Sequence, residues 1–100
     1  MALSKTYNAT TTGALPTSAA PTTPFQSYGL QVKGAGGTVT SFTVNLEGSL
    51  DNTNFTTLGT ASSDGALVSA TGKPATFVRA NVSALSLGTA TSINVYFTAV

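Results

Sequence analysis

The chain has 100 residues, of which 41% are hydrophobic and only 7% are charged, and its formal net charge is +1. A chain of this length folds as one domain around one core. Its four lysine and arginine residues are scattered along the sequence. This argues against nucleic acid or an anionic membrane as a partner, because both require many cations in one patch. The chain has no cysteine, which excludes disulfides and thiolate chemistry.

Residues 1–24 are rich in threonine and alanine and contain three of the four prolines of the chain. Such a segment does not hold a continuous β-ladder or fill a core, and it predicts an extended N-terminal arm. Residues 25–100 are then expected to fold without it. The sequence begins at Met1 with neither a secretion signal nor a membrane span, so we expect a complete chain that is not exported through a signal peptide.

The arm contains few bulky side chains. Residues 2–7 can form a short strand, in which Leu3 and Tyr7 are the large groups without simple alternation, and Leu15 follows further along. An extended segment of this kind can add a strand to the sheet of a neighbouring protein. Its bulky side chains then determine the register of the pairing. We therefore predict that Leu3, Tyr7 and Leu15 contact a partner.

The first predicted strand of the domain begins at Phe25. Tyr28, Leu30 and Val32 alternate with polar residues, which is typical of a half-buried strand. The glycine-rich residues 34–37 end this strand and predict a turn.

The next segment predicts a β-hairpin. Residues 39–50 carry the clearest alternation of the chain, because the side chains at 42, 44 and 46 are apolar and those at 43, 45 and 47 are polar. The Asp-Asn-Thr-Asn sequence at residues 51–54 predicts a turn, because Asp and Asn bond their own backbone and tolerate left-handed geometry. The chain should then fold back through residues 55–60.

Two further strands are expected nearer the C-terminus. Residues 61–72 surround a short apolar stretch and predict either a brief strand or a loop, which Pro74 closes. Alternation returns over residues 75–83 and over residues 92–100. The linker at residues 84–88 holds at most one turn of helix, since no longer window has helical periodicity.

Five to seven short strands at about ten-residue spacing, separated by Gly, Asn and Asp turns, are typical of a small antiparallel β-sandwich. The fold class is therefore all-β. The predicted core residues are Tyr28, Leu30, Val32, Phe42, Val44, Leu46, Val78, Ala80, Val82, Ile93, Val95 and Phe97.

The sequence offers little for catalysis. It has no histidine and no cysteine, the side chains that most often exchange protons near neutral pH. Glu47 and Asp51 are close in sequence, but one lies on the polar face of a strand and the other begins a turn, so no shared cleft is expected. Residues 51–54 lack the carboxylates of a calcium loop, and residues 34–37 lack the features of a phosphate-binding loop. We expect no enzyme activity, no metal and no cofactor.

Arg79 stands alone on the polar face of its predicted strand. Two roles remain open for it. The first is contact with a partner, alongside Leu3, Tyr7 and Leu15. The second is a surface ion pair with Glu47 or Asp64.

Two segments resemble small β-sandwich proteins of tailed-phage particles. The sequence FTVNLEGSLDNTNFTTL at residues 42–58 resembles a hairpin common in these proteins, and FVRANVSALSLGTATSINVYFTAV at residues 77–100 is similar to their closing pair of strands. The chain departs from the commonest form at Asn52 and Phe55, where Gly and Trp are frequent. The resemblance covers residues 25–100.

Within that group, a chain of this size is similar to capsid decoration (cement) proteins, which clamp neighbouring subunits on the outside of the icosahedral head. The resemblance implies a structural virion protein on the outer capsid surface, with the major capsid protein as partner. It also implies a homo-oligomer, often a trimer. Two alternatives remain open: a receptor- or glycan-binding module of a phage fibre or surface protein, and a head-tail or tail component.

Overall fold

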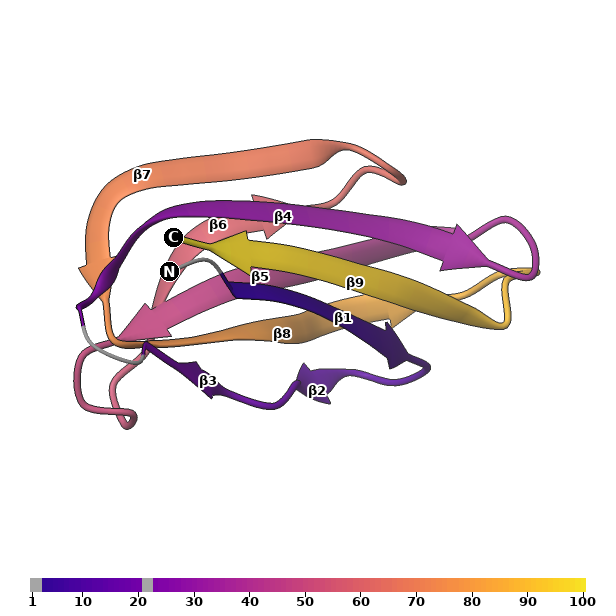
Figure 1. Ribbon diagram of the computed structural model, residues 1–100. Helices are drawn as coiled ribbons and strands as arrows, with labels where there is room; N and C mark the ends of the chain where they lie inside the picture. The colour runs from indigo at the N-terminus through magenta and orange to yellow at the C-terminus, as the bar shows by residue number, and fades with distance from the viewer. Residues whose placement is uncertain (1–2, 21–22) are drawn as a thin grey trace.

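The structure is a computed structural model and describes residues 3–20 and 23–100 (Figure 1). The described residues form strands joined by turns and contain no helix, as predicted. The strands are β1 (Leu3–Ala9), β2 (Gly13–Ala14), β3 (Ser18–Ala19), β4 (Phe25–Ala35), β5 (Ser41–Ser49), β6 (Thr56–Ala61), β7 (Leu67–Ala75), β8 (Phe77–Ser86) and β9 (Ser92–Ala99). Among these residues, no helix is long and apolar enough to cross a membrane.

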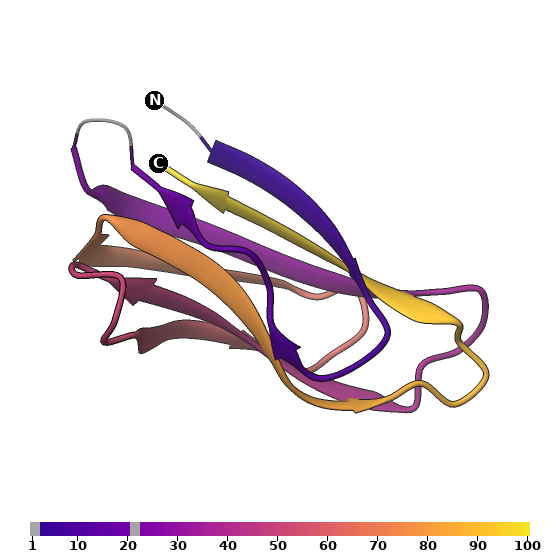
Figure 2. The same ribbon diagram turned by 90° about the horizontal axis from the view of Figure 1, so that it is seen from below.

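The strands form two antiparallel sheets that pack face to face (Figures 1 and 2). Sheet A has the order β1-β9-β4-β7. Sheet B has the order β2-β8-β5-β6, and β3 also pairs with β8. The predicted small β-sandwich is therefore confirmed.

The core lies between the two sheets and consists of the residues that the alternation predicts. Each of the twelve predicted core residues is exposed by 4% or less. Burying a Val, Leu, Ile or Phe side chain contributes about 1.5–3 kcal/mol relative to leaving it exposed. The inward faces of β4, β5, β8 and β9 supply these residues, so these four strands carry most of the core.

Strands that follow each other along the chain do not always pair. The predicted hairpin of residues 39–60 is confirmed, since β5 pairs with β6. The glycine-rich turn after β4 instead carries the chain from sheet A to sheet B. Gly37 is required in this turn because a Cβ there would overlap the carbonyl oxygen of Thr89. Strands β8 and β9, which resemble a closing pair, likewise belong to different sheets.

The stretch that could be strand or loop forms β7, which continues through Pro74. Proline removes a backbone donor and is therefore tolerated in a sheet chiefly at an edge. Strand β7 is an edge strand of sheet A. Its register with β4 shifts just before Pro74, between Thr71 and Ala75.

The N-terminal segment belongs to the sandwich. Residues 1–2 and 21–22 of the predicted arm lie outside the described residues. The rest is extended, as predicted, but β1 pairs with β9 over seven residues, and β2 and β3 pair with β8. The segment thus covers the edge of sheet A and then the edge of sheet B (Figure 2). It lies along the sandwich instead of reaching away from it.

The sequence pattern does not predict the pairing of β1 with β9, because the inward positions of β1 are not all apolar. Lys5 is opposite Phe97, on the core side of the strand between Leu3 and Tyr7. Its long side chain remains exposed at the sheet edge, where an inward-pointing charge discourages pairing with another chain.

Replacing Val44 or Val95 by Asp should prevent folding. Both valines are fully buried, and an unpaired carboxylate between the sheets costs several kcal/mol, comparable with the stability of a whole domain. Thermal melting followed by circular dichroism tests this, with Val100→Asp as the control because the Val100 side chain is 60% exposed. A core variant that melts like the parent would overturn the assignment of the inner faces.

Deleting residues 2–20 should prevent folding or lower the melting temperature strongly, because the deletion removes an edge strand from each sheet. A graded version uses single substitutions. Tyr7→Ala should cost about 2 kcal/mol of unfolding free energy, since the Tyr7 ring packs on the core. Thr6→Ala, at the exposed neighbouring position, should cost little. A truncated chain that melts like the parent would show that residues 25–100 fold independently.

Candidate functional site

Three of the four predicted partner-binding residues pack against the chain's own core. Leu3, Tyr7 and Leu15 are half-buried beside it. The Tyr7 ring stacks on the Phe97 ring, with 5.9 Å between centroids and 27° between planes. In the isolated chain these side chains therefore anchor the N-terminal segment. Their contact with a partner remains a prediction.

The fourth residue, Arg79, forms an ion pair on the outer face of sheet B. Its Nε donates a hydrogen bond to Glu47 Oε1 at 2.9 Å, and its guanidinium lies 3.9 Å from the centroid of the Phe55 ring. Asn81 Nδ2 donates to the other Glu47 oxygen at 3.3 Å. The ion pair with Glu47 is thus formed, whereas Asp64 pairs with Lys33 at 3.0 Å. Phe55 was missed as a member of this cluster because it lies in a turn far from Arg79 in sequence.

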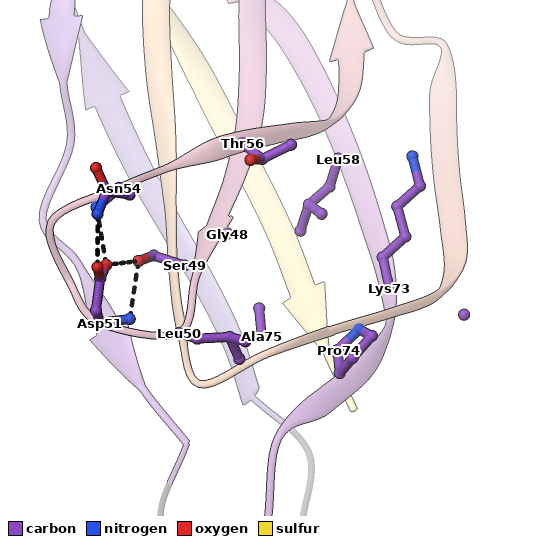
Figure 3. Close-up of a pocket in the computed structure, with 11 residues that line it drawn as sticks. Gly48, Ser49, Leu50, Asp51, Asn54, Thr56, Leu58, Lys73, Pro74 and Ala75 are labelled. Carbon is purple, nitrogen blue, oxygen red and sulfur yellow. Dashed lines mark hydrogen bonds between the residues drawn. The ribbon is translucent and has the colours of Figure 1, made fainter.

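A groove of about 530 Å³ opens at one end of the sandwich, between the tip of the β5–β6 hairpin and the end of β7 (Figure 3). Its apolar lining comes from Leu50, Leu58, Pro74 and Ala75. Gly48 lets the two walls approach each other, since a Cβ there would lie 2.8 Å from Leu58 Cδ1 and 2.9 Å from Ala75 Cβ.

Asp51 closes the hairpin tip beside this groove (Figure 3). Its Oδ1 accepts hydrogen bonds from the backbone N–H groups of Thr53 (2.9 Å) and Asn54 (2.8 Å). Ser49 Oγ (2.8 Å) and Asn54 Nδ2 (2.7 Å) donate to the same carboxylate. Asn52 adopts the left-handed conformation that this turn needs, with φ of 60°. The predicted turn at residues 51–54 is therefore confirmed.

These hydrogen bonds, led by the backbone N–H of Asn54, hold the pKa of Asp51 far below its ordinary value of 3.8. An exposed carboxylate that is ionised and already engaged is a poor proton donor or acceptor near neutral pH. The apolar part of the groove is suited to holding an apolar group. Within residues 3–20 and 23–100, no three potential metal-ligand side chains of His, Cys, Asp or Glu gather together.

The outer face of sheet A carries few charges. Residues opposite each other in an antiparallel sheet point to the same side, so two rows of outward side chains cross all four strands. One row contains Thr6, Tyr96, Gln31 and Leu67, and the next contains Ser4, Thr98, Gly29 and Ser69. Tyr96 and Leu67 are exposed by 38% and 74%. This surface combines uncharged polar residues with two exposed apolar groups, and a shallow hollow of about 160 Å³ lies among them.

Acidification should weaken the hairpin through Asp51. A carboxyl whose pKa is lowered by folding stabilises the folded chain above its ordinary pKa, and this stabilisation is lost as the pH falls through the folded pKa. Asp51→Asn should therefore melt below the parent at neutral pH, and the difference should narrow as the pH falls below 3.8. Melting curves at a series of pH values measure this.

Asp64 provides the control, because a hydrogen bond from the Gly34 backbone N–H, followed by one from Lys33, also lowers its pKa. In Asp64→Asn, the melting temperature should still fall on acidification because of Asp51. In the double variant, the contributions of both carboxylates to this fall should be lost. A constant difference between Asp51→Asn and the parent at every pH would contradict the role of the Asp51 charge.

No protein-family model matches the sequence, and no curated protein sequence matches it either. Among solved structures, the chain is similar to the crystal structure of the SPBc2 prophage-derived protein YomS, with a TM-score of 0.65. The match covers 99% of this chain and 94% of that chain, at 10% sequence identity. Similarity at this level of identity concerns the fold. The similarity of fold therefore extends over nearly the whole length of both chains.

Proposed function

We propose that this chain is a structural protein of a phage particle and that it decorates the outer surface of the capsid. In this role it braces contacts between subunits of the major capsid protein and carries out no catalysis. The observation that carries the proposal is the outer face of sheet A, where two rows of uncharged residues cross all four strands and include the exposed side chains of Tyr96 and Leu67. The end-to-end similarity of the fold to a prophage-derived protein supports a phage origin.

The outer face of sheet A is large enough for a specific contact. Four strands spaced about 4.8 Å apart, each about eight residues long at about 3.4 Å per residue, span roughly 19 by 27 Å. Side-chain relief increases the accessible area of such a face toward the roughly 800 Å² that each partner buries in a standard interface. Exposed Tyr96 is of the type that most often dominates binding energy.

Few charges lie near this face, which suits a contact between uncharged surfaces. Lys33 extends from β4 toward the Asp64 loop and is paired there with the Asp64 carboxylate at 3.0 Å. Lys33 lies outside the two rows described above, and all residues of those rows are uncharged. Contacts of this composition depend little on ionic strength, because salt screens charges and leaves apolar contacts nearly unchanged. Repetition over a shell then multiplies a modest contact, since many copies must detach before subunits separate.

A charge placed at the centre of this face should block attachment. Thr98 lies exposed on the central strand β9, and Thr98→Lys should weaken binding to particles that lack the protein by about tenfold or more, because the ammonium would be buried without a partner. Thr57→Lys is the matched control, since Thr57 is exposed on sheet B opposite Glu47. Co-sedimentation with particles measures both. Equal binding of the two variants would place the contact elsewhere.

The number of copies in a purified particle distinguishes decoration from the alternatives. A decoration protein should be present in the same number as the major capsid protein, or in a simple fraction of it. Quantitative mass spectrometry of purified particles gives this ratio. A handful of copies per particle would instead indicate a fibre, head-tail or tail component, and the decoration proposal would fail.

A further inference from the structure

The sandwich has four sheet edges, and three of them are protected against pairing with another chain. Edge strands expose unpaired backbone N–H and C=O groups, which proteins usually protect with charges, prolines, bulges or short strands. On β1 the inward-facing Lys5 provides this protection. Strands β2 and β3 have two residues each and are separated by Pro16. On β6 the register shifts opposite Leu46 and Glu47.

The fourth edge, the first half of β7, lacks such protection. Residues 67–71 have the sequence LVSAT, with no charge and no proline, and their register with β4 is regular. Inward-facing Val68 and Ala70 are only half-buried at this edge. Outward-facing Leu67 is 74% exposed, the largest exposure among the large hydrophobic side chains of the described residues. A further strand at this edge would satisfy its backbone groups and cover apolar surface.

We propose that a second copy of the chain supplies that strand, and that the two β7 strands pair antiparallel about a two-fold axis at Ser69. In this register Leu67 is opposite Thr71 of the second copy, and Val68 is opposite Ala70 of the second copy. Odd-numbered residues are then opposite odd-numbered residues, and even-numbered opposite even-numbered. The backbone N–H and C=O groups that β4 leaves unpaired on one β7 strand therefore face the corresponding groups on the other. All five unprotected residues are used, and no like charges meet. Sheet A then continues through both copies as one sheet of eight strands.

The charges beyond the paired residues favour this second copy. The regular pairing ends at Thr71, because β7 bends at Gly72, whose φ is 76°. The antiparallel arrangement still places the end of β7 that carries Lys73 beside the loop of the second copy that carries Asp64. Lys73 is exposed and forms no ion pair within residues 3–20 and 23–100. The Asp64 side chain is 41% exposed. The two-fold axis repeats this ammonium-carboxylate approach at both ends of the interface, and opposite charges placed in this way fix the register of a contact.

A charge at the two-fold axis tests the pairing. Ser69 is exposed and lies opposite Gly29, so Ser69→Lys fits the isolated chain but places two like charges opposite each other in the dimer. It should weaken self-association by about tenfold or more. Ser4→Lys is the matched control, because Ser4 lies in the same row of sheet A at its opposite edge. Sedimentation equilibrium over a range of chain concentrations measures both, and melting curves check that both variants fold.

Cysteine substitution tests the register itself in a chain that has no other cysteine. Directly opposite residues of antiparallel strands have Cα atoms about 4.5–5.5 Å apart, within the range of a disulfide. Oxidised Ser69→Cys should therefore form a covalent dimer readily. Thr71→Cys should not, because the two Thr71 positions would be four residues apart along the pairing, about 13 Å.

Each result of these measurements either supports the β7 pairing or overturns it. A dimer that Ser69→Lys disrupts and Ser69→Cys crosslinks supports the proposal. A monomer at every concentration overturns it and leaves the β7 edge free for a strand of another protein. A trimer, or a dimer that Ser69→Lys leaves intact, also overturns it and places self-association on another surface. These measurements use the free chain, so their result is independent of whether the chain binds a capsid.

Discussion

The position of β9 constrains the whole fold. The last strand of the chain lies between the first strand, β1, and the earlier strand β4, and pairs with both along its length. Its inward side chains Ile93, Val95 and Phe97 are exposed by 1% or less. Sheet A therefore cannot form until the two ends of the chain meet, and long-range pairing of this kind folds slowly. Strand β1 then leads the chain to β2 and β3, which close the edge of sheet B.

Sequence alternation predicts which side chains face inward, but not which strands are neighbours. The inward residues of β4, β5, β8 and β9 could be predicted because every second position is apolar. The sheet to which each strand belongs could not, since the turn after β4 suits a hairpin as well as a crossing between sheets. A short strand near residues 2–7 was predicted, but its pairing with β9 was not, because Lys5 interrupts its apolar face. Arg79 was located correctly on a polar face, but its stacking on Phe55 depends on tertiary structure.

The few charges of this chain serve mainly to hold its own elements together. Of the seven charged residues, five are engaged within the molecule: Lys33 with Asp64, Arg79 with Glu47, and Asp51 with its own turn. Two of these contacts hold segments outside the core, namely the loop before β7 and the hairpin tip, and the third lies across the paired strands β5 and β8. All three carboxylates are therefore occupied. Lys5 and Lys73 are the charges left for contacts outside the molecule within the described residues.

The antiparallel pairing of β1 with β9 also decides how the molecule would respond to force. Leu3 is opposite Ala99, so β1 begins where β9 ends, at the same end of the β1–β9 ladder (Figure 1). A pull that separates these ends breaks the hydrogen bonds of the β1–β9 ladder one pair after another, beginning at Leu3. A pull along the strand axes loads the whole ladder at once and meets far greater resistance. A force applied parallel to the strands through the face of sheet A therefore does not peel β1 from β9. A force applied to either terminus, away from the sandwich, would peel them apart.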